Sequence, residues 1–345
     1  MRRSALTILL TVLGAQCLVG QGTKEERLSL MLYGDVNLGR SVGQELLAGD
    51  TGFPFRKVRD TLSAADVVFV NLESQLSDQE GETQDPKHNL IFTGPPSGAI
   101  ALRQSNVGVV STANNHAFDY GMTALRETIL RLQAAGVRFV GTSFDSLGGA
   151  VPAIVEKHGI RIGFLAYTEF VNLKGAWAGR IALFDSSQAC RDVQELRSKV
   201  DFLVVSYHGG LEYVDRPSTK LRNNLRAVVD AGADMVVGHH PHYAQGIEVY
   251  HDKLIFYSLG NFVFYQPQRE LARLGLGADV TLVRRKGSVK AEKARLLPVR
   301  AGLQPAFDLT REEELAFLQR LRKLSSVQIT DSERTWTITL QHDNE

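Results

Sequence analysis

Cysteine is nearly absent from this chain of 345 residues, which contains only Cys17 and Cys190. If an N-terminal leader is removed at or after Cys17, Cys190 is the only cysteine certain to remain. No intramolecular disulfide framework is then available. The fold must rest on its hydrophobic core and on any metal that it binds.

The chain also lacks an excess of charge of either sign. Its formal net charge is +1, and no clustered basic face with interleaved aromatic residues is present. These features exclude broad electrostatic attraction to nucleic acid or to an anionic membrane, so we expect no nucleic-acid partner. With 43% hydrophobic and 22% charged residues, the composition is that of an ordinary globular protein. We expect one main domain in which any charge recognition is local.

No apolar run is long enough for a comfortable bilayer span of ~20 residues. The basic start Met1-Arg2-Arg3 is followed by an apolar run from Ala5 to Ala15 and then by the polar stretch Gln21–Arg27. This pattern predicts a signal peptide over residues 1–23 that is cleaved, and hence an exported protein that is periplasmic, extracellular or membrane-tethered. An uncleaved anchor and a lipid-modified Cys17 stay open as alternatives.

From residue 27 onward, short apolar runs alternate with segments of helical periodicity, which predicts an α/β fold with a mostly parallel sheet. The predicted strands are Leu28–Tyr33, Val67–Val70, Val107–Ser111, Arg138–Gly141, Ile160–Tyr167, Phe202–Ser206, Met235–Val237 and Leu254–Tyr257. The predicted helices are Phe55–Ser63, Ser97–Gln104, Thr123–Ala135, Ser187–Val200 and Ser218–Ala231. The polar stretch Ser77–Lys87 is interpreted as an exposed loop.

The main domain is expected to span residues 27–278. Residues 279–345 are expected to form an extension packed on the same domain. This extension contains a hairpin turn at Lys286-Gly287-Ser288, an amphipathic helix at Arg311–Leu324 and a final strand at Thr335–Leu340.

Polar residues of the kinds that bind metals follow five of the apolar runs. The five runs end in Gly34-Asp35, Asn71-Leu72-Glu73, Asn114-Asn115-His116, Tyr207-His208 and His239-His240-Pro241-His242. Because the carboxyl ends of parallel strands open onto a shared crevice, we expect these residues to converge on one site. Each residue alone also has a plainer interpretation, as a helix cap or as a hydrogen-bonded structural histidine.

This set of ligands combines oxygen and imidazole and contains no thiolate. It suits a divalent ion such as Mn²⁺, Zn²⁺ or Fe²⁺ better than a soft structural metal site. A carboxylate can bridge two ions, and two ions roughly 3.5–4 Å apart lower the pKa of a bridging water. The sequence therefore predicts a divalent-metal site that holds one or two ions.

The same motifs, taken in order, resemble those of the CapA family of poly-γ-glutamate capsule synthesis proteins. The resemblance runs from about Leu28 to Phe264 and adds Gly39-Arg40, His208-x-Gly210-x-Glu212-Tyr213 and Tyr257-Ser258-Leu259-Gly260-Asn261-Phe262 to the motifs above. The family implies a layered α/β sandwich like that of the calcineurin-like metallophosphoesterases. The sites of those enzymes hold two divalent ions.

The resemblance also implies roles for individual residues. Six residues resemble metal ligands: Asp35, Glu73, Asn115, His208, His240 and His242. Glu73 resembles the bridging carboxylate, and His239 is an alternative to His240. His116 resembles the histidine that protonates the leaving group, with Asp119 as its orienting partner.

Further residues near these motifs are expected to contact the substrate: Asn37, Arg40, Glu212, Tyr213 and His239. Arg40 would act through a charge-assisted fork to a carboxylate or phosphate. Two positions depart from the superfamily pattern. Asn37 stands where a histidine is usual, and Ala117 stands where an acid usually follows the third-motif histidine.

Three functions follow as hypotheses. The first is an exported, CapA-like role in the synthesis or export of a capsule polymer of the poly-γ-glutamate type. The second is a metal-dependent hydrolase, a phosphoesterase or polymer amidase, that is unrelated to capsule. The third is a non-catalytic scaffold that binds an anionic polymer. The expected partners are an anionic polymer or a phosphorylated substrate, together with a membrane-bound polymer synthase.

Overall fold

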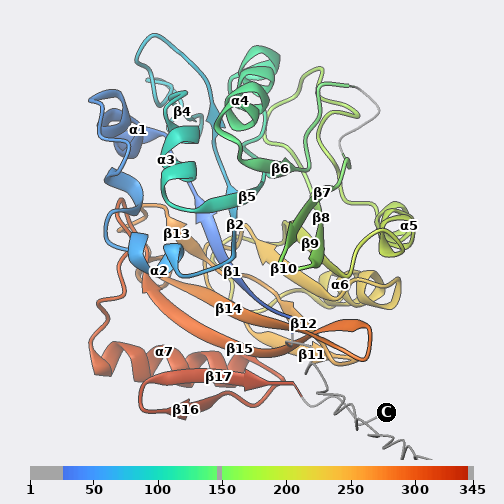
Figure 1. Cartoon of the computed structure of the whole chain (residues 1–345). Coiled ribbons are helices and arrows are strands. Elements are labelled where there is room, and N and C mark those ends of the chain that lie inside the picture. The colour runs from blue at the N-terminus through green and yellow to red at the C-terminus, as the bar shows by residue number, and fades with distance from the viewer. Residues whose placement is uncertain (1–25, 146–149, 341–345) are drawn as a thin grey trace, which may run out of the picture.

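A computed structural model of the protein describes residues 26–145 and 150–340 (Figure 1). The predicted signal peptide at residues 1–23 lies outside the described residues. Within the part of the chain that is described, no helix has the length and apolar character needed to cross a membrane.

Two mixed β-sheets form the centre of the molecule. The larger sheet has the order β16 (Thr330–Ser332), β17 (Thr335–Thr339), β15 (Ser288–Arg300), β14 (Leu274–Arg285), β1 (Arg27–Val36), β2 (Val67–Leu72), β5 (Val107–Ser111) and β6 (Arg138–Val140), and β13 (Asn261–Val263) pairs with β1. The smaller sheet has the order β11 (Ile247–Tyr250), β12 (Lys253–Phe256), β10 (Met235–His239), β9 (Phe202–His208), β8 (Ile160–Thr168) and β7 (Ala153–Lys157). The parallel strands are thus divided between two sheets rather than gathered in one.

Helices cover the outer face of each sheet, so the fold is the expected layered α/β sandwich. The larger sheet packs against α1 (Arg40–Leu47), a 3₁₀ turn at Phe53–Phe55, α2 (Arg59–Ser63), α3 (Gly98–Gln104) and α4 (Gly121–Ala135). The smaller sheet packs against α5 (Ser186–Arg197) and α6 (Thr219–Asp230), on the right of Figure 1. The remaining helical elements are a second 3₁₀ turn at Glu270–Arg273 and α7 (Arg311–Leu324), and a short parallel pair is formed by β3 (Gln75–Leu76) and β4 (Thr93–Gly94).

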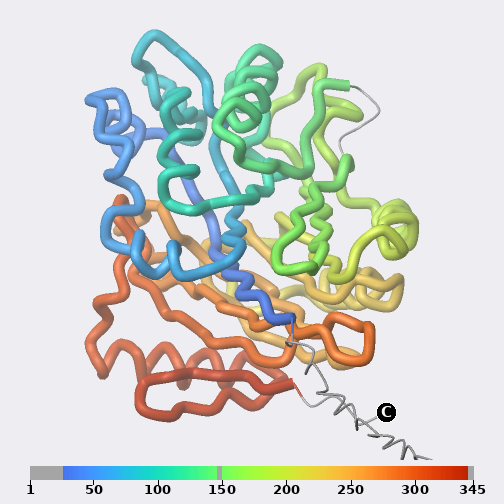
Figure 2. Tube along the Cα trace, in the orientation of Figure 1, coloured from blue at the N-terminus to red at the C-terminus, as the bar shows by residue number. Residues whose placement is uncertain are grey.

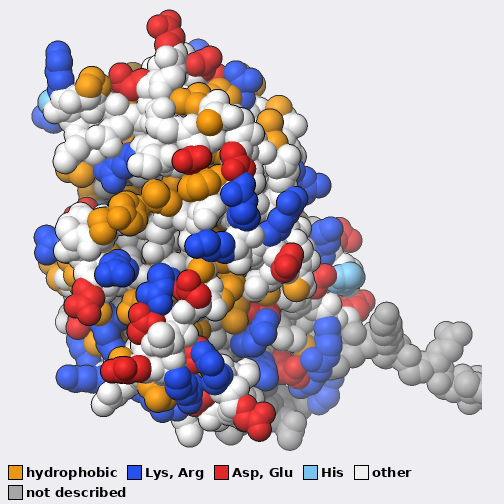
Figure 3. All heavy atoms as spheres, turned by 90° about the vertical axis from the view of Figure 1, so that its left-hand side faces the viewer, with side chains coloured by type: hydrophobic (Ala, Val, Ile, Leu, Met, Phe, Trp, Pro, Cys, Tyr) orange, Lys and Arg blue, Asp and Glu red, His pale blue; other side chains and the backbone are white. Residues whose placement is uncertain are grey.

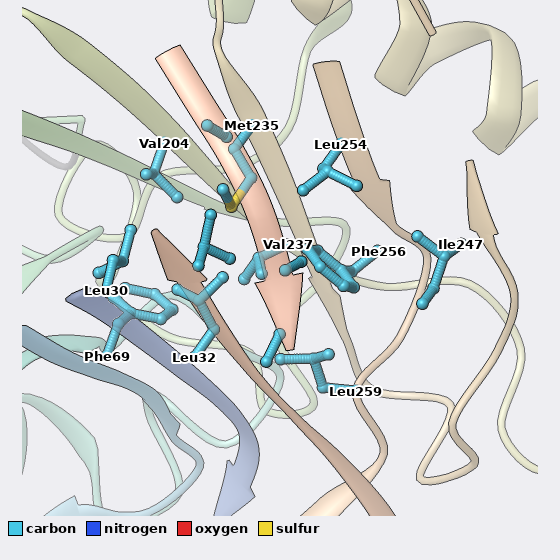
Figure 4. Close-up of a cluster of buried hydrophobic side chains, with 14 of the residues drawn as sticks. Leu30, Leu32, Phe69, Val204, Met235, Val237, Ile247, Leu254, Phe256 and Leu259 are labelled. Atoms are coloured by element: carbon cyan, nitrogen blue, oxygen red, sulfur yellow. The ribbon is translucent and has the colours of Figure 1, made fainter. Parts of the chain in front are cut away.

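The main hydrophobic core lies between the two sheets. Leu30, Leu32 and Phe69 from the larger sheet meet Val237 and Phe256 from the smaller one (Figure 4). Alternate residues of β1 point the other way, into the layer between the larger sheet and its helices. Central strands that are buried on both faces need continuous apolar sequence, which is why these segments were recognisable as short apolar runs.

The C-terminal extension continues the larger sheet. β14 begins at Leu274, ahead of the predicted boundary at residue 278, and pairs antiparallel with β1. In Figure 2 the blue N-terminal strand accordingly lies beside orange C-terminal strands. Helix α7 starts at a capping box formed by Thr310 and Glu313, as an S/T-x-x-E pattern predicts. The extension therefore shares its backbone hydrogen bonds with the main domain.

Trp336 of β17 fixes α7 to this extended sheet, and its removal provides a test of that packing. Its ring is 1% exposed and stacks on Phe317 of α7 with 6.1 Å between ring centroids. We expect Trp336→Ala to lower the free energy of unfolding by about 3–5 kcal/mol, as buried aromatic truncations do. Urea denaturation measures the change. Leu315→Ala, at a site on the same helix that is 45% exposed, should stay within about 0.5 kcal/mol of wild type, and equal effects of the two variants would contradict the packing described.

Candidate metal centre

The larger sheet places two carboxylates at the same edge. Asp35 lies near the end of β1, paired in parallel register with Asn71 of β2, and Glu73 follows directly after β2. Gly34 allows this arrangement, because a Cβ at that position would overlap the carbonyl oxygen of Gly260. Both carboxylates are fully buried.

The smaller sheet brings the histidines to the same place. His208 ends β9 and is in register with His239, which ends β10. The chain then turns so that His240 and His242 point back toward the carboxylates, and both adopt the left-handed backbone region with φ of 94° and 56°. Non-glycine residues rarely adopt such angles, and they concentrate at functional sites where the surroundings enforce them.

Side chains from the two sheets form two groups, each with three potential metal ligands. One group consists of Glu73, His208 and His240, and the other of Asp35, Glu73 and His242. Within each group the potential ligand atoms all lie within 4.8 Å of one another. Glu73 belongs to both groups, which is the arrangement expected of a bridging carboxylate.

The hydrogen bonding of these residues shows that a cation fits between them. Both carboxylate oxygens of Glu73, Oδ2 of Asp35 and Nδ1 of His240 are buried without a hydrogen-bond partner. Unpartnered buried carboxylates are costly, and carboxylate oxygen with imidazole nitrogen is a donor set that suits Mn²⁺, Zn²⁺ or Fe²⁺. The residues present therefore match a divalent ion in number, type and direction.

Two asparagines hold the ligands in place. The Nδ2 amide of Asn71 donates to Oδ1 of Asp35 at 2.9 Å and lies 3.1 Å from Nδ1 of His208. Oδ1 of Asn261 lies 2.9 Å from Nδ1 of His242. Both residues belong to the sequence motifs, but the contact between Asn71 and His208 joins the two sheets and is not visible in a local pattern. Such supporting hydrogen bonds fix the orientation of metal-binding side chains.

Asn115 lies beside the group of Glu73, His208 and His240. Its Oδ1 atom is 2.8 Å from Nε2 of His208, and its side chain is almost fully buried. The structure thus brings together all six residues that the sequence predicted as metal ligands: Asp35, Glu73, Asn115, His208, His240 and His242.

Burial and mutual charge shift the ionisation of this cluster. Burial alone would raise the pKa of Asp35, but His239 and His242 beside it hold that pKa well below its usual range. Burial and the nearby Asp35 carboxylate raise the pKa of Glu73 well above its usual range. Burial lowers the pKa of His208 strongly and that of His240 to about 3. The imidazoles of His208 and His240 are therefore neutral at pH 7, as metal ligands must be.

His116 and Asp119 form a pair at the rim of this cluster. Nδ1 of His116 lies 2.7 Å from Oδ2 of Asp119, which also accepts a hydrogen bond from the backbone N–H of Phe92 at 3.1 Å. The Phe92 ring packs on His116 with 4.2 Å between centroids. The carboxylate absent at position 117 is thus supplied from position 119, and the imidazole has a fixed orientation.

Four of the residues that were expected to contact the substrate lie at different distances from the candidate metal ligands: Asn37, His239, Glu212 and Tyr213. Oδ1 of Asn37 accepts a hydrogen bond from the backbone N–H of Gly39 at 2.8 Å, so this oxygen is used within its own loop. His239 is fully buried, with Nδ1 3.5 Å from Oδ1 of Asp35, and it belongs to neither group of three ligands. Oε1 of Glu212 lies 4.0 Å from Nε2 of His242, and the Tyr213 ring lies 5.7 Å from the His242 ring.

The lowered pKa of His240 predicts how acid destabilises the metal-free protein. In the unfolded chain His240 is protonated below its ordinary pKa of about 6.5. In the folded protein its pKa is about 3, so His240 stays neutral until the pH falls to about that value. The free energy of unfolding therefore decreases as the pH is lowered, and this residue accounts for a loss of about 2 kcal/mol between pH 7 and pH 5. In chemical denaturation with a chelator present, His240→Gln should lose correspondingly less stability over this interval than wild type. Equal losses in the two proteins would contradict a buried neutral His240.

Comparison with known proteins identifies relatives across most of the chain. The family model of bacterial capsule synthesis protein PGA_cap matches residues 29–266. The chain is 34% identical over 247 residues to the PGA biosynthesis protein CapA of Bacillus subtilis (strain 168), and 32% identical over 259 residues to the capsule biosynthesis protein CapA of Bacillus anthracis. Each alignment covers 70% of this chain, but only 64% and 61% of the two relatives.

Among solved structures, the calcineurin-like phosphoesterase YfkN from Bacillus subtilis is similar with a TM-score of 0.46 and 13% sequence identity, over 87% of this chain and 99% of that chain. The candidate metal centre is formed by the side chains described above, independently of this distant similarity. The match to the family model includes both carboxylates and all the histidines of the centre. The chain belongs to the bacterial capsule synthesis protein PGA_cap family, that of the CapA proteins.

Proposed function

We propose that this protein acts in making, exporting or anchoring a surface polymer of the poly-γ-glutamate type, and that it does so as a metal-dependent hydrolase. The observation that carries the proposal is the position of Glu73. Its carboxylate is shared by two groups of ligands, and both of its oxygens are buried without a partner. A passive scaffold has no need for such a costly arrangement.

The residues of the centre have distinct tasks in this proposal. Asp35, Glu73, Asn115, His208, His240 and His242 would hold one or two divalent ions, which when bound supply an activated water and stabilise charge on the attacked phosphoryl or acyl group. His116 donates a proton to the leaving group, and Asp119 holds its ring in the orientation for that transfer. The aromatic ring of Phe92 shields this pair from water on one side.

The cellular setting forms part of the same proposal. We propose export of the protein, on the basis of the basic and apolar start of the sequence. The relatives are described by their roles in capsule and PGA biosynthesis. For such a role we propose an anionic polymer and a membrane-bound polymer synthase as partners. A phosphorylated polymer precursor is the alternative substrate.

One observation favours a second candidate, a scaffold that binds the polymer without cleaving it. Position 37 is an asparagine where the superfamily uses a histidine, and its oxygen is already hydrogen-bonded within the loop. The group of Asp35, Glu73 and His242 therefore has one imidazole fewer than the usual pattern. A divalent ion that is bound more weakly at this position would suit polymer binding better than hydrolysis.

Complementation separates these functions. In a polymer-producing host whose own copy of the gene is deleted, the wild-type gene should restore surface polymer, whereas Glu73→Gln, which removes the shared charge, and His116→Gln, which removes the acid, should each restore less than about a tenth. Glu195→Gln, at a side chain that is 77% exposed, serves as the control. Full restoration by both site variants would support the scaffold over the hydrolase, and unchanged polymer after deletion would refute the role in polymer production.

A further inference from the structure

Arg40 is a half-buried cation beside the candidate metal centre, and no acid in the described part of the chain pairs with it. It begins α1 in the left-handed backbone region with φ of 53°, and its backbone N–H donates to the carbonyl oxygen of Thr83 at 2.9 Å. Across residues 26–145 and 150–340, no carboxylate oxygen lies within 4.0 Å of its guanidinium. Other arginines of the protein, such as Arg226 and Arg300, form ion pairs with glutamates.

Two aromatic rings hold the Arg40 guanidinium in place. Its Cζ atom lies 4.4 Å from the ring centroid of Phe92 and 5.9 Å from that of Phe264. Each of these rings also contacts a histidine of the candidate site. Phe92 packs on His116, and the Phe264 ring lies 4.9 Å from the His242 ring. Cation–π contacts of this kind keep an arginine extended without neutralising its charge. The guanidinium therefore lies between the candidate proton donor and a candidate metal ligand.

The hydrogen-bonding capacity of Arg40 is mostly unused. Nη2 donates to the carbonyl oxygen of Asn89 at 2.7 Å, while Nε is buried and has no partner. A guanidinium has five N–H donors in a planar fork, and buried donors are nearly always satisfied. The nearest opposing charges, Glu73 and Asp119, act on Arg40 only through the field and are engaged with the ligand groups and with His116. An unpaired guanidinium fork in this position has the chemistry needed to bind an anion.

The segment between β3 and β4 holds the backbone of Arg40 in place. Thr83 accepts the Arg40 backbone N–H and returns a hydrogen bond from Oγ1 to the Arg40 carbonyl at 2.9 Å. Gln44 of α1 donates to the same Oγ1 at 2.9 Å. The stretch Ser77–Lys87, which the sequence indicated to be an exposed loop, carries Thr83 as a buried anchor for Arg40. The fold thus spends several polar contacts on the position of one cation.

Figure 3 shows Lys and Arg side chains interspersed with Asp and Glu over the face that it displays, with no region of one sign. The formal net charge of the whole chain is only +1. A solvated surface charge attracts an anion weakly, whereas a partly desolvated guanidinium pairs with it strongly. Recognition of an anionic substrate by this face therefore depends on local groups.

We propose that Arg40 binds an anionic group of the substrate next to the bond that reacts, and thereby selects substrates that carry such a group. The group is a carboxylate or a phosphate, since the fork of a guanidinium suits both. This inference rests on the proposed function for the reaction itself. It adds a specificity-determining residue that lies outside the groups of metal ligands.

Calorimetry with two small anions tests the role of Arg40. γ-Linked diglutamate and inorganic phosphate are titrated into the purified protein, with and without Mn²⁺. Wild type should bind at least one of them, and Arg40→Gln should weaken that binding about 10–100-fold, as expected for loss of a charge-assisted pair. Arg40→Lys should fall between the two, because a lysine keeps the charge but loses the fork. Arg131→Gln, on the exposed side of α4, should bind like wild type.

The outcomes distinguish this inference from the proposed function. Loss of diglutamate affinity in Arg40→Gln identifies a carboxylate as the anion, and loss of phosphate affinity identifies a phosphate. Affinities within twofold of wild type in both Arg40 variants, or a wild type that binds neither probe, would overturn the role of Arg40. Loss of bound metal in Arg40→Gln would also overturn it, because Arg40 would then position the centre. A wild-type protein that binds an anion through Arg40 but holds no metal would refute the hydrolase alone.

Discussion

Two buried carboxylates, Asp35 and Glu73, lie together where the sheets meet, and the structure around them depends on how their repulsion is offset. Neither is exposed to water, and the Asp35 carboxylate raises the pKa of Glu73. The histidines beside Asp35 and the Asn71 amide offset this cost only in part, because Glu73 retains two unpartnered oxygens. A divalent cation bound between them would remove the repulsion and supply the missing partner. Fold stability and chemistry would then be coupled at this point.

The layered architecture explains why such a site can form at all. The carboxylates come from the larger sheet and His208, His240 and His242 from the smaller one, so each group of ligands spans both sheets. The large apolar core directly beneath, shown in Figure 4, holds the sheets at a fixed separation. The left-handed turns at His240 and His242 are maintained against this rigid background. Packing energy in the core thus stabilises a strained and polar site at its edge.

The sequence allowed most strands to be predicted, because buried central strands are continuous apolar runs. It did not show that the strands divide between two sheets, since periodicity carries no information on which strands are neighbours. Short edge strands such as β7 and β11 were missed for lack of a distinctive pattern, and the short helix α1 was also missed. The predicted helix at Phe55–Ser63 is instead a 3₁₀ turn followed by the short α2.

The candidate site was predictable to a different degree. The six candidate ligands follow strand ends, so residue type and position at a sheet edge predicted that these segments converge. The resemblance to the CapA family implied which residue of each segment is the ligand. The supports were not predictable in the same way. Asn71 contacts His208 from the other sheet, and Arg40 is held by Asn89, Phe92 and Phe264. These contacts depend on the packing of distant segments, which no local pattern records.

Elemental analysis of the purified protein tests the candidate metal centre most directly. The wild-type protein should contain Mn, Zn or Fe in near-stoichiometric amount, and Glu73→Ala/His242→Ala, which removes ligands from both groups, should contain almost none. Wild-type protein that is purified without metal and stays metal-free after incubation with Mn²⁺, Zn²⁺ or Fe²⁺ would contradict the centre described here, and with it the proposed hydrolase.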